Sequence, residues 1–229
     1  MPAPILIFHH GLFMLGDPPT LCEHALKIAM EQMHVLKESG LLDAASEFHV
    51  GINGGDESHL LAEMVFPEKA QIKYHGLDSR SENLTHVMIE ERLKTLDGEA
   101  YILYEHQKGS THEESSPYGQ YATNWRRRME FHCVTNWRQC VADLDAGYEA
   151  VGCHWLTGQG WDKSQHYFAG TYHWCKASFR KTIPSIYTRQ RIKDSGIGAL
   201  ESRYEAEVII GNGPRLPSVK NYYSGAIGT

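Results

Sequence analysis

The sequence predicts an α/β fold in which helices cover both faces of a mostly parallel central sheet. Strand-like and helix-like patterns alternate through the first half of the chain, as they do when parallel strands are connected through helices. The chain has 229 residues, of which 41% are hydrophobic, and this is enough for one well-packed core. We therefore expect a single domain that spans residues 1–229.

The expected strands are short apolar segments, at residues 4–10, 47–53, 70–75 and 100–104. Helices are expected between them, at residues 19–38, 57–65 and 81–96. The first helix carries Leu26, Ala29, Met33 and Leu36 at helical spacing, so its apolar side should face the sheet.

The second half is expected to begin with one long helix at residues 121–144. Trp125 and Trp137 belong to two Asn-Trp-Arg elements of this segment, a little over three helical turns apart, and we expect both to be packed. A strand at residues 149–155 and an apolar stretch at residues 166–175 follow, with a glycine-rich loop between them.

Charge is unevenly distributed along the chain. Residues 1–119 have a net charge of −11 and residues 120–229 of +5, which together give the −6 of the whole chain. A basic second half could face a ligand that carries phosphate, or these charges could simply be solvated on helix surfaces. The sequence leaves both readings open.

The cysteines and the apolar runs indicate a cytoplasmic protein without a membrane span. No apolar run approaches the roughly 20 residues that a membrane-spanning helix needs, and the first residues do not resemble a secretory signal. Five widely spaced cysteines suit reduced thiols better than a disulfide framework. These are Cys22, Cys133, Cys140, Cys153 and Cys175.

Several common catalytic fingerprints are missing from the sequence. It contains neither the phosphate-binding loop of NTPases nor the glycine-rich turn of dinucleotide-binding proteins. It also lacks a Gly-x-Ser-x-Gly elbow and paired Cys-x-x-Cys motifs. Among fourteen histidines, His9 and His10 are adjacent on a strand, so they should point to opposite faces and should not share a metal.

Parallel sheets bind ligands beyond the carboxyl ends of their strands. In this chain those ends carry residues 9–11, residues 53–55, Gly76 and residues 105–109. We therefore expect the ligand site to include residues from these four segments.

Five sequence blocks follow one another in the second half. They are Tyr-Ile-Leu-Tyr-Glu-His-Gln-Lys-Gly at residues 101–109, Trp125-Arg126 with Met129, residues 150–155, residues 168–176, and Arg-Tyr-Glu-Ala-Glu at residues 203–207. In this order the blocks resemble GT-A-type glycosyltransferase-like proteins of bacteria and viruses. Those proteins carry a strand ending in His-Thr-Lys-Gly, a Trp-Arg-x-x-Met helix, a Val-Gly strand, a Phe-Ser-Gly-Asn-Phe-Trp-Trp-Ala block and an Arg-x-Glu-x-Glu segment. The resemblance covers about residues 100–210.

The chain departs from that pattern at four positions. Gln107 replaces Thr, Ala169 replaces Ser, Thr171 replaces Asn and His173 replaces the first Trp. Three of these positions belong to the block that should line the sugar. The identity of donor and acceptor therefore does not carry over.

The resemblance implies a single GT-A-like (Rossmann-like) domain, with a nucleotide-binding half at residues 1–119 and an acceptor half at residues 120–229. It implies transfer of a sugar from a nucleoside diphosphate sugar, such as a UDP-sugar, to an acceptor hydroxyl. The acceptor could be a glycan or a hydroxymethylated base in viral DNA, whose phosphates basic residues such as Arg126–Arg128, Arg180, Lys181 and residues 189–193 could contact. A non-catalytic nucleotide- or carbohydrate-binding module is the alternative.

The resemblance also suggests which residues bind the donor. Lys108, on a loop that ends at Gly109, should approach the diphosphate, and Arg126 should reach it from the next helix. The nucleotide should lie near His10, Gly11 and Asn53, with His106 beside it.

GT-A enzymes commonly carry an Asp-x-Asp metal motif at the end of this strand, and this sequence has none there. Glu105 and His106 are the nearest substitute. Either cationic side chains replace the divalent metal, or these two residues bind one unconventionally. We favour the first.

The last two blocks should supply the sugar site and the catalytic base. Gly170 would permit close backbone approach, and Trp174 would either stack on a sugar or fill the core. Glu205 and Glu207 form an acidic pair near the acceptor, of which we favour Glu205 as the general base. Glu207 could instead pair with Arg203.

Overall fold

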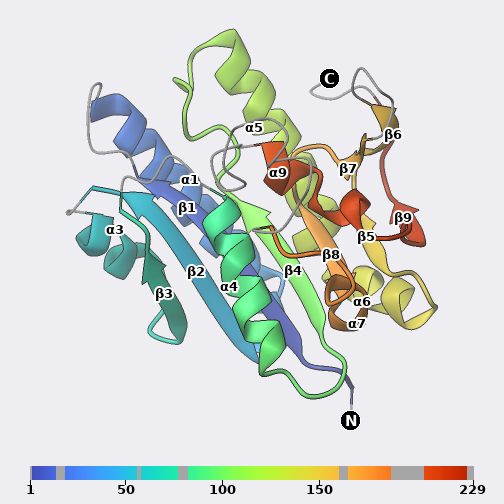
Figure 1. The fold of residues 1–229 in the computed structure, drawn as a ribbon. Helices are drawn as coiled ribbons and strands as arrows, with labels where there is room; N and C mark the ends of the chain where they lie inside the picture. Colours follow the sequence, from blue (N-terminus) through green and yellow to red (C-terminus); the bar gives the residue numbers. More distant parts are fainter. Residues whose placement is uncertain are drawn as a thin grey trace.

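The structure is a computed structural model that describes residues 2–13, 19–55, 58–76, 82–159, 165–186 and 204–225. A seven-stranded sheet in the order β3-β2-β1-β4-β8-β5-β9 forms its centre (Figure 1). The first half of the chain supplies four neighbouring parallel strands. They are β1 (Ile5–Phe13), β2 (Glu47–Gly54), β3 (Ala70–Tyr74) and β4 (Tyr101–His106).

The second half continues the same sheet. β8 (His173–Lys176) pairs with β4 and with β5 (Ala150–Gly152), antiparallel to both, and β9 (Val219–Asn221) lies parallel to β5. A small separate sheet pairs β6 (Trp155–Gln159) with β7 (Gln165–Phe168). The predicted mostly parallel sheet is confirmed, and it contains strands from both halves of the chain.

Helices cover both faces of the sheet, as predicted. One apolar cluster joins the sheet to α1 (Pro19–Glu38), α2 (Leu41–Ala44), α3 (Ser58–Val65) and α5 (Pro117–Glu130), and to α6 (Trp137–Asp145) beyond it. A second cluster, on the other face, joins the sheet to α4 (Asn83–Lys94), α7 (Ala177–Arg180) and the 3-10 helix η2 (Ile209–Asn212). Helix α9 (Tyr204–Glu207) packs against α4.

The alternation of side chains along β1 creates these two clusters. Ile5 and Ile7 belong to the cluster under α1, whereas Leu6 and Phe8 belong to the cluster under α4. Successive side chains of a strand point to opposite faces. The position of a polar residue near the end of β1 therefore decides which face of the sheet its side chain points to.

The predicted helix at residues 121–144 is interrupted. A π-helix, η1 (Phe131–Thr135), separates α5 from α6. A π-helix turns through a smaller angle per residue than an α-helix, because its hydrogen bonds span five residues instead of four. Trp125 and Trp137 are both packed as predicted, with 8% and 9% of their surface exposed.

The predicted strand at residues 149–155 and the apolar stretch after it are each divided by a turn of the backbone. The segment at residues 149–155 becomes β5 and β6, with His154 at a φ of 57° between them. The stretch at residues 166–175 becomes β7 and β8, separated by Gly170 and Thr171 at φ values of 86° and 61°. A positive φ does not fit an extended strand, so pairing stops at these positions. Within the described residues, no helix is long and apolar enough to cross a membrane.

Candidate functional site

Two histidines lie side by side at the carboxyl edge of the parallel strands. His10 of β1 and His106 of β4 are register partners, and both point to the face covered by α4. Nδ1 of His10 is 2.9 Å from Oγ1 of Thr85, and Nδ1 of His106 is 2.8 Å from Oε2 of Glu82. The site therefore joins two strand ends to the beginning of one helix.

The approach of Thr85 to His10 depends on a glycine of the neighbouring strand. A Cβ atom at Gly51 would lie 2.2 Å from the Thr85 hydroxyl oxygen, which is too close for any side chain. Glycine at this position of β2 thus leaves the space in which Thr85 reaches His10.

Glu82 collects hydrogen bonds from three directions. Besides His106, the Tyr104 hydroxyl donates to its Oε2 at 3.1 Å and the Thr171 hydroxyl at 3.3 Å. Burial would raise the pKa of Glu82, but the attraction of His106 and the hydrogen bond from its Nδ1 hold that pKa well below its ordinary value. Glu82, which precedes the first residue of α4, is thus an ionised carboxylate.

Burial makes His10 a neutral histidine. It lowers the pKa of His10 from 6.5 to about 3, against the opposing pull of Glu82. The Nε2 atoms of His10 and His106 are both buried, and neither has a hydrogen-bond partner in the described part of the chain. Buried polar atoms of this kind cost stability unless a ligand or water satisfies them.

Thr171 reaches Glu82 from a strained backbone. Its φ of 61° is unusual for a β-branched residue, and only 1% of its surface is exposed. Such strain persists where the surroundings over-determine the conformation, often at functional sites. It adds a second observation that points to this cluster.

The opposite face of the same strands carries a different pair. Nδ1 of His9 is 3.0 Å from Oε1 of Glu105, and both side chains are almost fully buried. The prediction that His9 and His10 point to opposite faces is therefore confirmed. Glu105 and His106 are separated in the same way, so the suggestion that they bind one metal together is wrong. Across the described ranges, no group of three His, Cys, Asp or Glu side chains could hold a metal ion.

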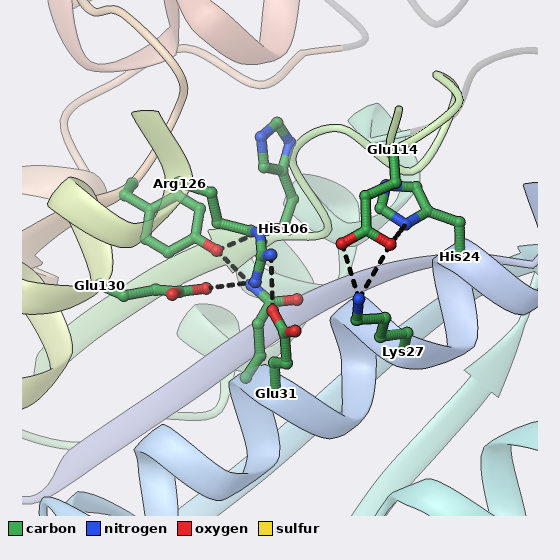
Figure 2. Close-up of polar contacts among 9 residues, drawn as sticks. His24, Lys27, Glu31, His106, Glu114, Arg126 and Glu130 are labelled. Carbon is green, nitrogen blue, oxygen red and sulfur yellow. Dashed lines mark hydrogen bonds and ion pairs between the residues drawn. The ribbon is translucent and has the colours of Figure 1, made fainter. Parts of the chain in front are cut away.

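Arg126 is buried in an ion-pair network instead of lining an open site. Its guanidinium lies 2.8 Å from Glu31 and 3.1 Å from Glu130, with 1% of its side chain exposed (Figure 2). The buried guanidinium is already paired with two carboxylates, so the structure corrects the prediction that Arg126 meets the diphosphate. Burial raises the pKa of Glu130 to about 7, although Arg126 acts in the opposite direction.

The backbone at the end of β4 is fixed by hydrogen bonds close to this ion-pair network. The Tyr172 hydroxyl donates to the backbone carbonyl of His106 at 2.8 Å, and Nε2 of Gln32 donates to that carbonyl at 3.0 Å and also to the Tyr172 hydroxyl. Figure 2 shows the His106 imidazole directed away from Arg126 and its carboxylates. These contacts fix the backbone while leaving the imidazole on the α4 side.

The loop after β4 lies at the same edge but faces α5. Nζ of the partly buried Lys108 is 4.2 Å from the ring centroid of Trp125. The side-chain oxygen of Gln107 accepts a hydrogen bond from the backbone of Leu12 at 2.8 Å, which ties this loop to β1. Gly109 adopts a φ of 98° in the turn. Lys108 thus lies at the expected edge, against an aromatic ring.

Two residues assigned to the sugar site pack inside the protein. Trp174 is fully buried in the core under α1, and its Nε1 donates to the backbone carbonyl of Cys133 at 2.7 Å. It fills the core, and the alternative of stacking on a sugar is corrected. A Cβ at Gly170 would lie 2.7 Å from Sδ of Met129, so the close approach at Gly170 is to α5.

The remaining predicted site residues are only partly placed. Gly11 lies inside β1, which continues to Phe13, and Asn53 is buried near the end of β2. Glu207 is partly buried in α9, near Tyr167, whose pKa is raised by burial and by this carboxylate. The side chain of Glu205 and all of Arg203 lie outside the described residues.

Basic residues expected along DNA phosphates are also partly buried. Arg126 is enclosed as described, and Arg180 is 2% exposed and 3.1 Å from Glu90. Residues 189–193 lie outside the described ranges. The structure therefore gives no support to a phosphate track through Arg126 and Arg180.

Glu82, Tyr104 and Thr85 do not stand out as site residues in the sequence, and Thr171 does so only as a departure from the family pattern. One signal was present for Glu82: an acidic residue immediately before a helix that leads into the strand ending at His106. Carboxylates are favoured at helix N-termini, and this end of α4 meets the carboxyl edge of the sheet.

No protein-family model matches the chain, and no curated protein matches its sequence. Solved structures with a similar fold include a protein assigned as a nucleotide-diphospho-sugar transferase from Desulfovibrio desulfuricans G20. It is 10% identical, with a TM-score of 0.45, and the match covers 96% of this chain and 80% of that chain.

Two further structures are similar at the same level. The 4-diphosphocytidyl-2C-methyl-D-erythritol synthase of Anaerococcus prevotii DSM 20548 is 12% identical, with a TM-score of 0.43 and coverage of 99% and 91%. A CMP:2-keto-3-deoxy-manno-octonic acid synthetase in complex with CTP is 10% identical, with a TM-score of 0.38 and coverage of 99% and 92%. These likenesses concern the fold, and none of them assigns an activity to this chain.

Proposed function

We propose that this protein transfers a sugar from a nucleoside diphosphate sugar to an acceptor hydroxyl. One observation carries the proposal: a charged and polar cluster lies at the carboxyl edge of β1 and β4, and two of its buried imidazole nitrogens have no partner among the described residues. Open α/β sheets bind ligands at this edge. The resemblance of residues 100–210 to glycosyltransferase-like proteins supplies the reaction type.

The donor should lie across the ends of β1 and β2. The nucleotide, for which we favour UDP, is placed near His10, Gly11 and Asn53, and its diphosphate is directed toward Lys108. A leaving diphosphate develops negative charge as the glycosidic bond breaks, and a nearby cation stabilises that charge. A bound donor at the opposite edge of the sheet would contradict this placement.

A thermal-shift screen against sugar nucleotides, with and without Mn²⁺, tests the proposal directly. A donor present at one hundred times its dissociation constant should stabilise the protein by about 2.7 kcal/mol. A shift that requires Mn²⁺ would favour metal-dependent binding, whereas a shift without it would favour cationic side chains in place of the metal. If no sugar nucleotide shifts the transition, the proposed function fails.

Replacing Lys108 with alanine should weaken donor binding and turnover while leaving the melting temperature nearly unchanged. Lys108 is partly exposed on a loop, where the contacts of a single lysine, such as that with Trp125, contribute little to folding. Isothermal titration with the donor and a thermal scan check both halves of the expectation. Wild-type donor affinity together with a wild-type rate would remove Lys108 from the site.

The acidic pair in α9 remains our sequence-based prediction for the base. If Glu205 takes the acceptor proton, Glu205→Gln should keep donor affinity and lower turnover by roughly 10²-fold or more. Glu207→Gln should then have the smaller kinetic effect. Steady-state rates decide, read with product stereochemistry because a retaining enzyme needs no such base. Inversion with full activity in Glu205→Gln would reject the assignment.

A non-catalytic binding module is the second candidate. The observation that favours it is the enclosure of Arg126 between Glu31 and Glu130, which removes one expected diphosphate ligand from the site. Slow hydrolysis of the sugar nucleotide, with water as acceptor, separates the two candidates. For the acceptor we favour a glycan, because a modified DNA base has no support from Arg126 or Arg180.

A further inference from the structure

Glu82 determines which nitrogen of His106 carries the proton. Its Oε2 lies 2.8 Å from Nδ1 of the imidazole, and an ionised carboxylate can only accept hydrogen bonds. Nδ1 must therefore be the donor. In the neutral ring, Nε2 then carries the lone pair and is able to take up a proton.

Among the described residues, that nitrogen is buried and has no hydrogen-bond partner. The same holds for Nε2 of His10 on the neighbouring strand. A group that binds beside His106 would satisfy this acceptor. Nε2 of His9, which pairs with Glu105 on the other face of the sheet, is in the same state. A hydroxyl group suits the position beside His106 because it can donate to one imidazole nitrogen.

The pair is held rigidly from several elements. Tyr104 and Thr171 hold the carboxylate of Glu82, and Thr171 does so from a strained backbone. Tyr172 and Gln32 hold the backbone carbonyl of His106 from the other side. A base that must meet a hydroxyl in one orientation needs this kind of support.

We propose that His106 is the general base of the transfer reaction and that Glu82 is its positioning residue. The inference rests on the proposed function and assigns the base to His106 in place of Glu205, the candidate from the sequence. The acceptor hydroxyl loses its proton to Nε2 of His106 while its oxygen forms a bond to the anomeric carbon. The bond from that carbon to the diphosphate oxygen breaks, and the nucleoside diphosphate leaves with the electron pair.

The Glu82 carboxylate stabilises the imidazolium that this step creates. The proton returns to solvent after the product leaves, which restores the starting state. Because the attack is direct, the product should have inverted stereochemistry at the anomeric carbon.

Kinetics of matched variants test the assignment. His106→Gln should bind the sugar nucleotide with an affinity within about twofold of wild type and lower kcat by roughly 10²-fold or more. Glu82→Gln should lower kcat by about tenfold with little change in the KM for the donor, because the ring remains but its proton is no longer fixed. His106→Gln with wild-type kcat, or a retained product configuration, would overturn the proposal.

The chain provides a matched control. Nε2 of His49 lies 2.7 Å from Oε2 of Glu47, a histidine–glutamate pair near the start of β2 and away from the carboxyl edge. His49→Gln should keep the wild-type kcat. If His49→Gln and His106→Gln lose activity equally, the loss reflects the fold and the assignment of His106 fails. A collapse in Glu205→Gln alone would move the base to α9.

A spectroscopic measurement tests the pairing of His106 with Glu82 without any substrate. In the ¹⁵N spectrum of the wild-type protein, neutral His106 should carry its proton on Nδ1, and Glu82→Gln should remove this preference. The opposite tautomer in the wild type would overturn the assignment even if His106→Gln does not fold. If the wild-type protein binds no sugar nucleotide, the proposed function is refuted. If the wild-type protein binds the donor and transfers the sugar, and His106→Gln is also active, only the assignment of the base is refuted.

Discussion

Arg126→Ala should lower the free energy of unfolding by about 3–5 kcal/mol, because it removes one partner of a buried ion pair and leaves the other uncompensated. Glu130 has 6% of its side chain exposed, and without Arg126 it would have to be buried as a charge or take up a proton. Urea denaturation followed by fluorescence measures the change, and the slope with urea should stay the same.

An exposed ion pair of helix α1 provides the comparison for the buried pair of Arg126. Nζ of Lys27 lies 2.6 Å from Glu114, with 51% and 49% of the two side chains exposed. Lys27→Ala should change stability by only about 0–1 kcal/mol, because water screens the pair. If Arg126→Ala is as stable as Lys27→Ala but binds the donor more weakly, the original assignment of Arg126 to the diphosphate returns.

Trp174→Ala should be the most destabilising single change on β8, at about 3–5 kcal/mol, since it removes a large aromatic side chain and leaves a cavity. The side chain is fully buried, and its Nε1 hydrogen bond to Cys133 links β8 to the π-helix. Thermal and chemical denaturation both measure this loss.

Trp174→Phe separates the cavity from the hydrogen bond. It keeps most of the ring volume and should cost less than Trp174→Ala, while it leaves the carbonyl of Cys133 without its donor. A variant that folds as stably as wild type but loses affinity for the sugar would show that Trp174 faces a ligand after all.

The elements of the first half were predictable from short apolar runs and from helical spacing. Strands β1 to β4 and helices α1, α3 and α4 lie within a few residues of their predicted bounds, since the strands are short apolar segments and apolar residues recur every three to four positions in a helix such as α1. The breaks at His154 and Thr171 were not predictable, because nothing in these two side chains requires a positive φ. The π-helix at residues 131–135 likewise continues a helical pattern without interruption in the sequence.

Only those residues of the candidate site that lie at strand ends were predictable from the sequence. His10 and His106 stood out because polar residues follow apolar strands. Their partners depend on where α4 lies against the sheet, which the sequence does not state, so Glu82 and Thr85 were missed. Arg126 was wrongly assigned to the diphosphate, and Trp174 was left between the sugar site and the core, because a motif gives the residue type and not its burial. The division into nucleotide-binding and acceptor halves stays a prediction.

The sheet order has a consequence for synthesis on the ribosome. β4 lies between β1 and β8 in the finished sheet, but β8 leaves the ribosome long after β4. Until then, a nascent chain in which β1 to β4 have paired carries an open edge of Tyr-Ile-Leu-Tyr, all buried in the folded protein. Unpaired apolar edges of this kind attract other chains. A chaperone that covers β4 until residue 176 is made would protect the protein at its most exposed moment.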